Sequence, residues 1–100
     1  MVKKIKVCGS VFDVKYVSDI VNNDNSPLWG EIQYDEMVIK IDKDLHIRQQ
    51  TKSLLHEIVH AISSEHMLDW NEKMVIKMTN IFQGILIDNK QFFKDVLNGS

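Results

Sequence analysis

Two histidines and a glutamate in the middle of the chain have the spacing of a metal-binding helix. His56, Glu57 and His60 belong to the run His56-Glu57-Ile58-Val59-His60, which has the form H-E-x-x-H. On an α-helix, residues four apart differ by about 40° in azimuth, so both imidazoles reach one ion. Glu57 lies just off that face, where a carboxylate deprotonates a water without binding the metal. The pattern predicts a Zn²⁺ site in which His56 and His60 bind zinc and Glu57 is the general base for peptide-bond hydrolysis.

The competing interpretation is a pair of histidines packed in a core helix without a metal. The motif is surrounded by apolar residues at helical spacing, which favours an amphipathic, central helix. They are Leu54, Leu55, Ile58, Val59 and Ile62. Burying two imidazoles and a carboxylate on such a helix is costly unless a metal compensates them, so the metal site is the favoured hypothesis.

A catalytic zinc ion takes three protein ligands and leaves one position for water, so one ligand remains to be found. Glu65 and His66 point away from His56 on a regular helix. Glu72 opens the next predicted helix and is the expected third ligand, with Asp69 in the intervening turn as the alternative. Asp69 to Glu72 also resembles a capping box, and a straight first helix would leave Glu72 about 10 Å above the histidines.

The sequence predicts strands before the motif and helices from the motif onward, which indicates an α+β fold. Alternating apolar and polar residues predict a hairpin over residues 3–17 and a second over 30–41, separated by a polar loop at 18–28. We expect these strands to form an N-terminal antiparallel sheet of about four strands. The second hairpin leads directly into the helix that carries the motif.

Three helices are expected after the sheet. The first runs from about residue 45 to 66 with Asp42 or Asp44 as N-cap, and a second, antiparallel helix begins after Trp70. A short third helix is expected to close the core with Phe92, Phe93, Val96 and Leu97. The second helix carries an apolar stripe that we expect to be core: Met74, Val75, Met78, Ile81, Phe82, Ile85 and Leu86.

Composition indicates one domain over residues 1–100 and excludes several classes of function. The chain has 44% hydrophobic residues and a formal net charge of −2, which gives no electrostatic footprint for direct nucleic-acid binding. We expect no membrane association because no apolar run approaches spanning length, and the lysines after Met1 are not followed by a signal core. With Cys8 as its single cysteine, the chain fits a cytoplasmic protein.

The chain resembles the small zinc metallopeptidase-like proteins of bacteriophages and mobile elements, which are similar to the ImmA/IrrE group. The resemblance covers about residues 28–90 and is carried by residues 54–62, 71–75 and 85–89 and by the strand 37–41. It implies a minimal zincin-like, gluzincin-type fold with His56, His60 and Glu72 as zinc ligands and Glu57 as general base. Members of the group cleave or inactivate transcriptional repressors, so the implied partner is a protein or peptide substrate such as a repressor. By the same resemblance, strand 37–41 is the expected sheet edge for substrate.

Two questions stay open at the level of sequence. The oxyanion of the reaction needs a second donor, for which Tyr34, Tyr16, His46 and His66 are candidates. The alternative to a metallopeptidase is a zinc-bound, catalytically inactive regulatory domain that binds another protein, with zinc joining the helices. A helical domain without metal is the third possibility.

Overall fold

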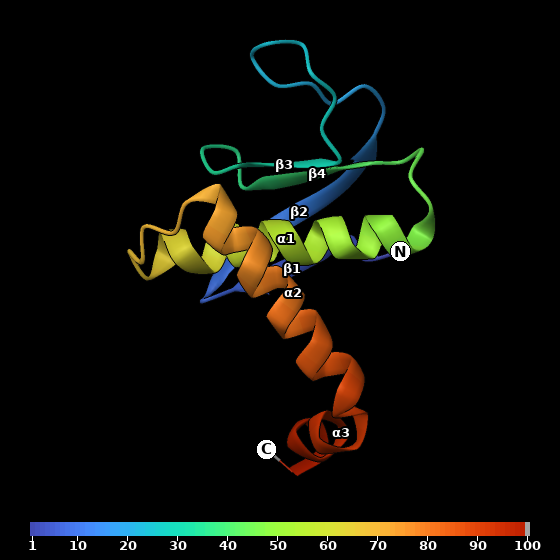
Figure 1. Ribbon diagram of the computed structural model, residues 1–100, viewed down its shortest axis with the longest axis vertical. Helices are drawn as coiled ribbons and strands as arrows, with labels where there is room; N and C mark the ends of the chain where they lie inside the picture. Colours follow the sequence, from blue (N-terminus) through green and yellow to red (C-terminus); the bar gives the residue numbers. More distant parts are fainter. Residues whose placement is uncertain (100) are drawn as a thin grey trace.

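The chain folds into a four-stranded sheet followed by three helices (Figure 1). This computed structural model describes residues 1–99. The strands are β1 (Lys4–Val7), β2 (Ser10–Val17), β3 (Gly30–Gln33) and β4 (Val38–Asp42), and the helices are α1 (Ile47–Glu65), α2 (Glu72–Asp88) and α3 (Lys90–Gly99). The predicted α+β class is confirmed, three helices follow the sheet as predicted, and the first lies within two residues of its expected bounds.

Both predicted hairpins are present. β1 pairs antiparallel with β2 and β3 pairs antiparallel with β4. In the first turn Cys8 and Gly9 both have positive φ values, 51° and 90°, which suits the right-handed twist of a two-residue hairpin. Met37 closes the second turn with a φ of 56°. Short local turns therefore produce the strand pairs that the alternating pattern predicts.

The two hairpins join in a way that the sequence did not predict. The strand order is β1-β2-β4-β3, and β2 runs parallel to β4, with Val14 opposite Ile39. The sheet is therefore mixed, and the prediction of an antiparallel sheet is wrong. Val38, Ile39 and Ile41 are all buried, which suits β4 to an interior position with a strand on each side.

This order also places β3, not β4, at one edge of the sheet. The prediction that residues 37–41 form an edge strand is wrong, because β4 is hydrogen-bonded on both sides. The loop at 18–29 connects β2 to β3 at the edge of the sheet, and the next strand, β4, lies between β3 and β2 (Figure 1). β3 and its neighbour β4 both contact the helix that carries the motif.

α1 lies across one face of the sheet and forms the core with it (Figure 1). Its apolar residues Leu54 and Ala61 pack against the buried strand residues, while Val59 is also fully buried. The strand residues of this core are Val7, Phe12, Val14, Ile39 and Ile41. The middle of the helix that carries the histidines is therefore packed against the sheet.

α1 begins at Ile47 and is capped by His46 instead of the predicted Asp42 or Asp44. His46 Nδ1 accepts a hydrogen bond from the Arg48 backbone at 3.2 Å, and Gln49 Oε1 accepts one from the His46 backbone at 3.2 Å. Asp42 instead accepts a hydrogen bond from the Asp44 backbone, so both aspartates belong to the preceding turn. An imidazole in the role usually taken by Ser, Thr, Asp or Asn explains why the sequence did not reveal this cap.

α2 and α3 pack less than their apolar residues predict. α2 crosses α1 steeply and then leaves it, so that only Val75 and Thr79 of α2 are buried (Figure 1). The predicted core stripe of α2 is confirmed only at Val75, with Met78 and Phe82 half-buried, whereas Met74, Ile81, Ile85 and Leu86 are exposed. The prediction of a closing α3 is wrong, because Phe92, Val96 and Leu97 are exposed. Among the elements of residues 1–99, α3 contacts α2 alone, and none of these helices is long and apolar enough to cross a membrane.

Candidate metal centre

α1 presents His56 and His60 side by side on the face that is turned toward α2. Their ring centroids are 4.9 Å apart, and both side chains are half-buried. The shared face follows from their spacing of four residues, as the sequence predicts. Both rings direct Nε2 toward the same point, because each of these nitrogens contacts Glu72.

The turn between α1 and α2 returns the chain to the level of the histidines. α1 stays helical to Glu65, but Leu68 N donates to the Ser63 carbonyl and Trp70 N donates to Ser63 Oγ, both at 2.9 Å. Left-handed backbone at Met67 and Asp69, with φ values of 52° and 55°, makes this reversal possible. The turn thus removes the predicted separation of Glu72 from the histidines, although α1 stays helical to Glu65.

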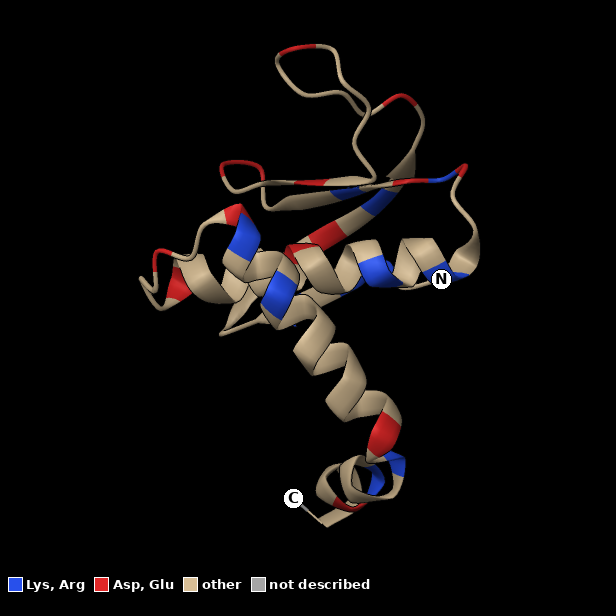
Figure 2. Cartoon of the chain, viewed as in Figure 1, with Lys and Arg blue, Asp and Glu red and all other residues tan. Residues whose placement is uncertain are grey.

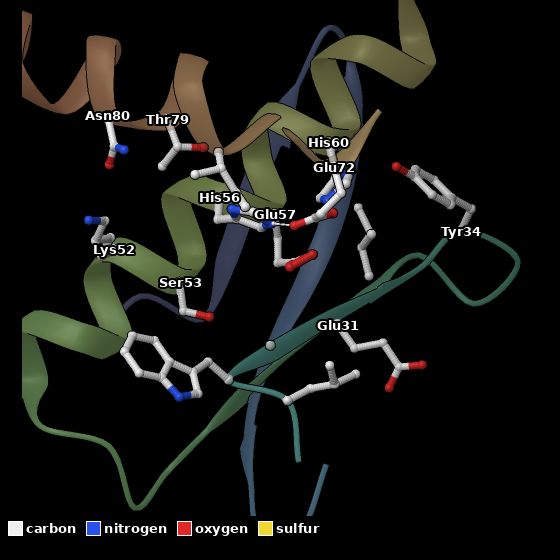
Figure 3. A pocket seen from close by; sticks show the side chains of 15 residues that line it. Glu31, Tyr34, Lys52, Ser53, His56, Glu57, His60, Glu72, Thr79 and Asn80 are labelled. Atoms are coloured by element: carbon white, nitrogen blue, oxygen red, sulfur yellow. Dashed lines mark hydrogen bonds and ion pairs between the residues drawn. The ribbon is translucent and has the colours of Figure 1, made fainter. Parts of the chain in front are cut away.

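Glu72 contacts both histidines at once. Its Oε1 lies 2.7 Å from His56 Nε2, and its Oε2 lies 2.8 Å from His60 Nε2 (Figure 3). The N-cap of α2 is Asn71, whose side chain accepts a hydrogen bond from the Met74 backbone, so the predicted capping box with Glu72 does not form. The Glu72 carboxylate is therefore free of its own helix and faces α1.

Asp69, the alternative third ligand, lies elsewhere. It borders a neighbouring hollow together with Tyr34, His60 and Ser63 and is not part of the group of potential ligands. That group consists of His56, His60 and Glu72, whose ligand atoms all lie within 4.8 Å of one another. Of the two sequence candidates, the structure brings Glu72 to the histidines.

The donor set and its spacing fit a tetrahedral metal ion. Donors bound to zinc at about 2.0 Å lie roughly 3.3 Å apart, which is within the spread of this group. Two imidazole nitrogens and a carboxylate oxygen are the ligands of a common class of catalytic zinc sites. Burial lowers the pKa of His56, an effect that the Glu72 carboxylate opposes, and burial thereby favours the neutral imidazole that a metal needs. The group can therefore hold a metal ion.

Glu57 lies beside this group without belonging to it. Its side chain is 5% exposed and reaches the cavity from the inner side of α1 (Figure 3). Burial raises its pKa to about 7, and the negative charges of Glu72 and Glu31 act in the same direction. A carboxyl with this pKa gains and loses a proton near neutral pH, as a general base requires.

The metal-binding group opens onto a cavity of about 620 Å³ between β3, α1 and α2. Its walls are largely apolar and include Leu28, Trp29, Ile32 and Ile76. Lys52 and Asn80 lie to one side of the histidines and Glu31 and Tyr34 to the other (Figure 3). The cavity is large enough for several residues of an extended peptide.

Gly30 brings β3 close to α1 and so shapes this cavity. A Cβ at Gly30 would lie 2.5 Å from Ser53 Oγ, 3.1 Å from Ile41 Cδ1 and 3.2 Å from the Lys40 carbonyl oxygen. Sequence reasoning assigned no role to Gly30, Ser53 or Trp29. A glycine at the start of a predicted strand was the signal, because such a glycine often marks a close approach of two segments.

The four candidate oxyanion donors have different surroundings. Tyr16 donates to the Val2 carbonyl at 2.9 Å, His46 caps α1, and His66 Nε2 lies 3.2 Å from Cys8 Sγ. Tyr34 borders the cavity together with the metal-binding group. Burial raises its pKa, so the phenol keeps its proton at neutral pH.

Comparisons with protein-family models, with curated proteins and with solved structures gave no match. A functional assignment therefore depends on the chemistry of the site. The features that bear on it are the His-His-Glu group, the buried Glu57 and the cavity that both face.

Proposed function

We propose that this protein is a zinc-dependent metallopeptidase that hydrolyses peptide bonds in the cavity between β3, α1 and α2. One observation carries the proposal: a potential three-ligand metal group and a buried carboxyl of raised pKa face the same cavity. A lone histidine pair would suit a structural metal equally well. A carboxyl with a pKa near 7 beside such a group suits proton transfer.

His56, His60 and Glu72 would hold the zinc ion. Zinc supplies a Lewis acid, which polarises a carbonyl and makes a water more acidic. Three protein ligands leave a coordination position for substrate or water, whereas structural zinc sites are usually closed by four protein ligands. The absence of a fourth His, Cys, Asp or Glu from the group, within the 99 described residues, favours a catalytic site.

Glu57 would carry the proton between water and the leaving amine. Its carboxylate takes a proton from the attacking water and later delivers it to the nitrogen of the broken peptide bond. Its burial shields the carboxylate from bulk water and raises its pKa above that of an ordinary glutamate, which makes it a stronger base. Glu72 is unsuited to this task because its two oxygens already face the two histidines.

The sequence resemblance to the ImmA/IrrE group supports the same proposal and suggests the substrate. By this resemblance the chain has a minimal zincin-like fold and cleaves a transcriptional repressor or another regulator of a phage or mobile element. The order of strands before an H-E-x-x-H helix agrees with that proposal. We infer a protein substrate whose extended segment enters the cavity beside β3.

The test is cleavage by the zinc-loaded protein of a peptide library and of candidate repressors in water enriched in ¹⁸O. We expect defined cleavage sites and one ¹⁸O atom in each new carboxylate, detected by mass spectrometry. Glu57→Gln should reduce the rate at least about 100-fold, as loss of a general base does. Glu36→Gln is the matched control, because Glu36 is exposed in the β3–β4 turn. Undiminished cleavage by Glu57→Gln would remove Glu57 from the mechanism.

A second candidate is a zinc-bound, catalytically inactive domain that binds another protein. The exposed apolar residues of α2 and α3 favour it, since contiguous exposed apolar surface is typical of protein-binding regions. In that case Glu57→Gln leaves all functions of the protein intact, and no repressor is cleaved. The same pair of proteins therefore separates the two candidates.

A further inference from the structure

Peptide hydrolysis places a negative charge on the former carbonyl oxygen, and a donor held at that position stabilises it. Glu57 does not serve this purpose, because it holds the proton in transit. Of the four candidate donors in the sequence, Tyr16 donates to a backbone carbonyl, and His46 caps the far end of α1. His66 lies against Cys8 at the other end of that helix. These three are engaged away from the cavity.

Tyr34 is placed differently. It follows β3 directly, and its ring packs edge-on against the fully buried Phe12, with centroids 6.3 Å apart and an interplanar angle of 78°. Its hydroxyl is directed toward His60 and Glu72 (Figure 3). The residue borders both the cavity and the adjoining hollow, and His60 borders both as well. The sheet and Phe12 thus hold a phenol beside the metal-binding group.

The phenol of Tyr34 keeps its hydrogen at neutral pH and can donate it. Burial raises the pKa of Tyr34 above its ordinary value, and this effect outweighs the opposite effect of the Ser64 side chain.

We propose that the Tyr34 hydroxyl is the oxyanion donor of this site, an inference that depends on the proposed peptidase function. The water oxygen bonds to the carbonyl carbon, its proton passes to Glu57, and the carbonyl π pair becomes a lone pair on the oxygen that Tyr34 stabilises. When the carbonyl re-forms, the C–N bond breaks and the proton on Glu57 goes to the departing nitrogen. Tyr34 keeps its own proton throughout.

The test compares Tyr34→Phe with Tyr16→Phe, which removes a hydroxyl distant from the cavity. Calorimetry measures the affinity of the zinc-loaded proteins for two ligands. The first is a peptide with a tetrahedral phosphinate in place of one peptide bond, and the second is the same peptide ending in a thiol. The phosphinate has a second oxygen for Tyr34, whereas the thiol has none. We expect Tyr34→Phe to weaken phosphinate binding about tenfold or more and to leave thiol and zinc affinity unchanged.

With a cleaved substrate, Tyr34→Phe should lower kcat about 100-fold or more at unchanged KM, and Tyr16→Phe should change neither. Phosphinate affinity within twofold of the unsubstituted protein would overturn the assignment of Tyr34, even if cleavage by the unsubstituted protein upheld the peptidase function. If the unsubstituted protein bound the thiol and not the phosphinate, the assignment would also fail. Absence of cleavage together with a tenfold loss of phosphinate affinity would support Tyr34 and count against the peptidase function alone.

Discussion

Glu57 is the residue on which the chemistry of the site depends most. A carboxyl that is 5% exposed and faces two other carboxylates is costly to ionise, which is the reason its pKa rises to about 7. The same burial that prepares it for proton transfer therefore destabilises the metal-free protein. Stability and chemistry are in opposition at this residue.

This opposition predicts a pH dependence of the free energy of unfolding. The pKa of Glu57 is about 7 in the folded protein, against 4.5 for an ordinary glutamate. Between these values the folded state holds a proton that the unfolded chain has lost, so the contribution of Glu57 to stability is most favourable below pH 4.5 and is lost as pH rises through 7. We expect Glu57→Gln to remove this loss, which amounts to about 3 kcal/mol at most.

The measurement is urea unfolding at pH 5 and pH 8 with a chelator present. His56, whose pKa is lowered, contributes an opposite slope below its unfolded pKa of 6.5. Because that contribution is common to both proteins, the difference between Glu57→Gln and the unsubstituted chain isolates Glu57. Equal differences at the two pH values would contradict the prediction.

At the residue scale, the sequence could predict only what helical geometry determines. The spacing of His56 and His60 places them on one face whatever the rest of the chain does. The position of Glu72 depends on the turn between α1 and α2, which the Ser63 hydrogen bond and the left-handed backbone of Met67 shape. No local sequence pattern reveals the path of that turn. Tyr34 could not be selected from four candidates because its position depends on the sheet order.

At the scale of elements, the approach of β3 to α1 determines the shape of the cavity. Gly30 allows that approach, since a side chain there would meet Ser53, Ile41 and the Lys40 backbone. Ser53 is itself buried on α1 and has little room to move. The distance between the edge strand and the histidine helix thus depends on a single residue.

We therefore expect Gly30→Ala to destabilise the fold by about 1 to 3 kcal/mol, as overpacking does. Gly84→Ala is the matched control: nothing lies within 4 Å of its added Cβ, and it is inside α2. That substitution should stabilise the protein by about 0.5 to 1 kcal/mol, because alanine is the better helix former. Chemical unfolding of both variants measures the effects, and a Gly30→Ala protein as stable as the unsubstituted one would refute the close approach.

Sheet topology shows where prediction from sequence stops at this scale. Hairpins and helices follow from periodicities within a few residues, and all of them were expected. The parallel pairing of β2 with β4 joins segments separated by the loop at 18–29 and by β3. No local pattern determines such a pairing, which depends on which strand is buried most. Val38 and Ile39 point to opposite faces of β4 and are both buried, which is typical of an interior strand and was not used in the sequence analysis.

The whole molecule is divided between a packed part and a projecting part. The sheet and α1 hold most of the buried residues, whereas the later part of α2 and all of α3 extend away from them (Figure 1). Between Lys77 and Asp88, α2 carries no charged residue (Figure 2), and none of the residues of this stretch after Thr79 is buried. The apolar stripe misled the sequence analysis because periodicity shows which face is apolar and not what covers it.

This division predicts very different effects for two phenylalanines. Phe12 is fully buried in the sheet, so Phe12→Ala should cost about 3 to 5 kcal/mol of unfolding free energy. Phe92 on α3 is 62% exposed, so Phe92→Ala should change stability by less than about 0.5 kcal/mol. Urea denaturation of the two variants distinguishes them, and a large cost for Phe92→Ala would show that α3 is packed against the core.

The account as a whole depends on zinc binding by His56, His60 and Glu72, which calorimetric titration of zinc into the metal-free protein tests most directly. We predict one ion per chain, an affinity lowered at least about tenfold in Glu72→Gln, and an unchanged affinity in the matched control Asp69→Asn. Binding of less than about 0.2 equivalents, or equal affinity for the unsubstituted protein and Glu72→Gln, would contradict the account.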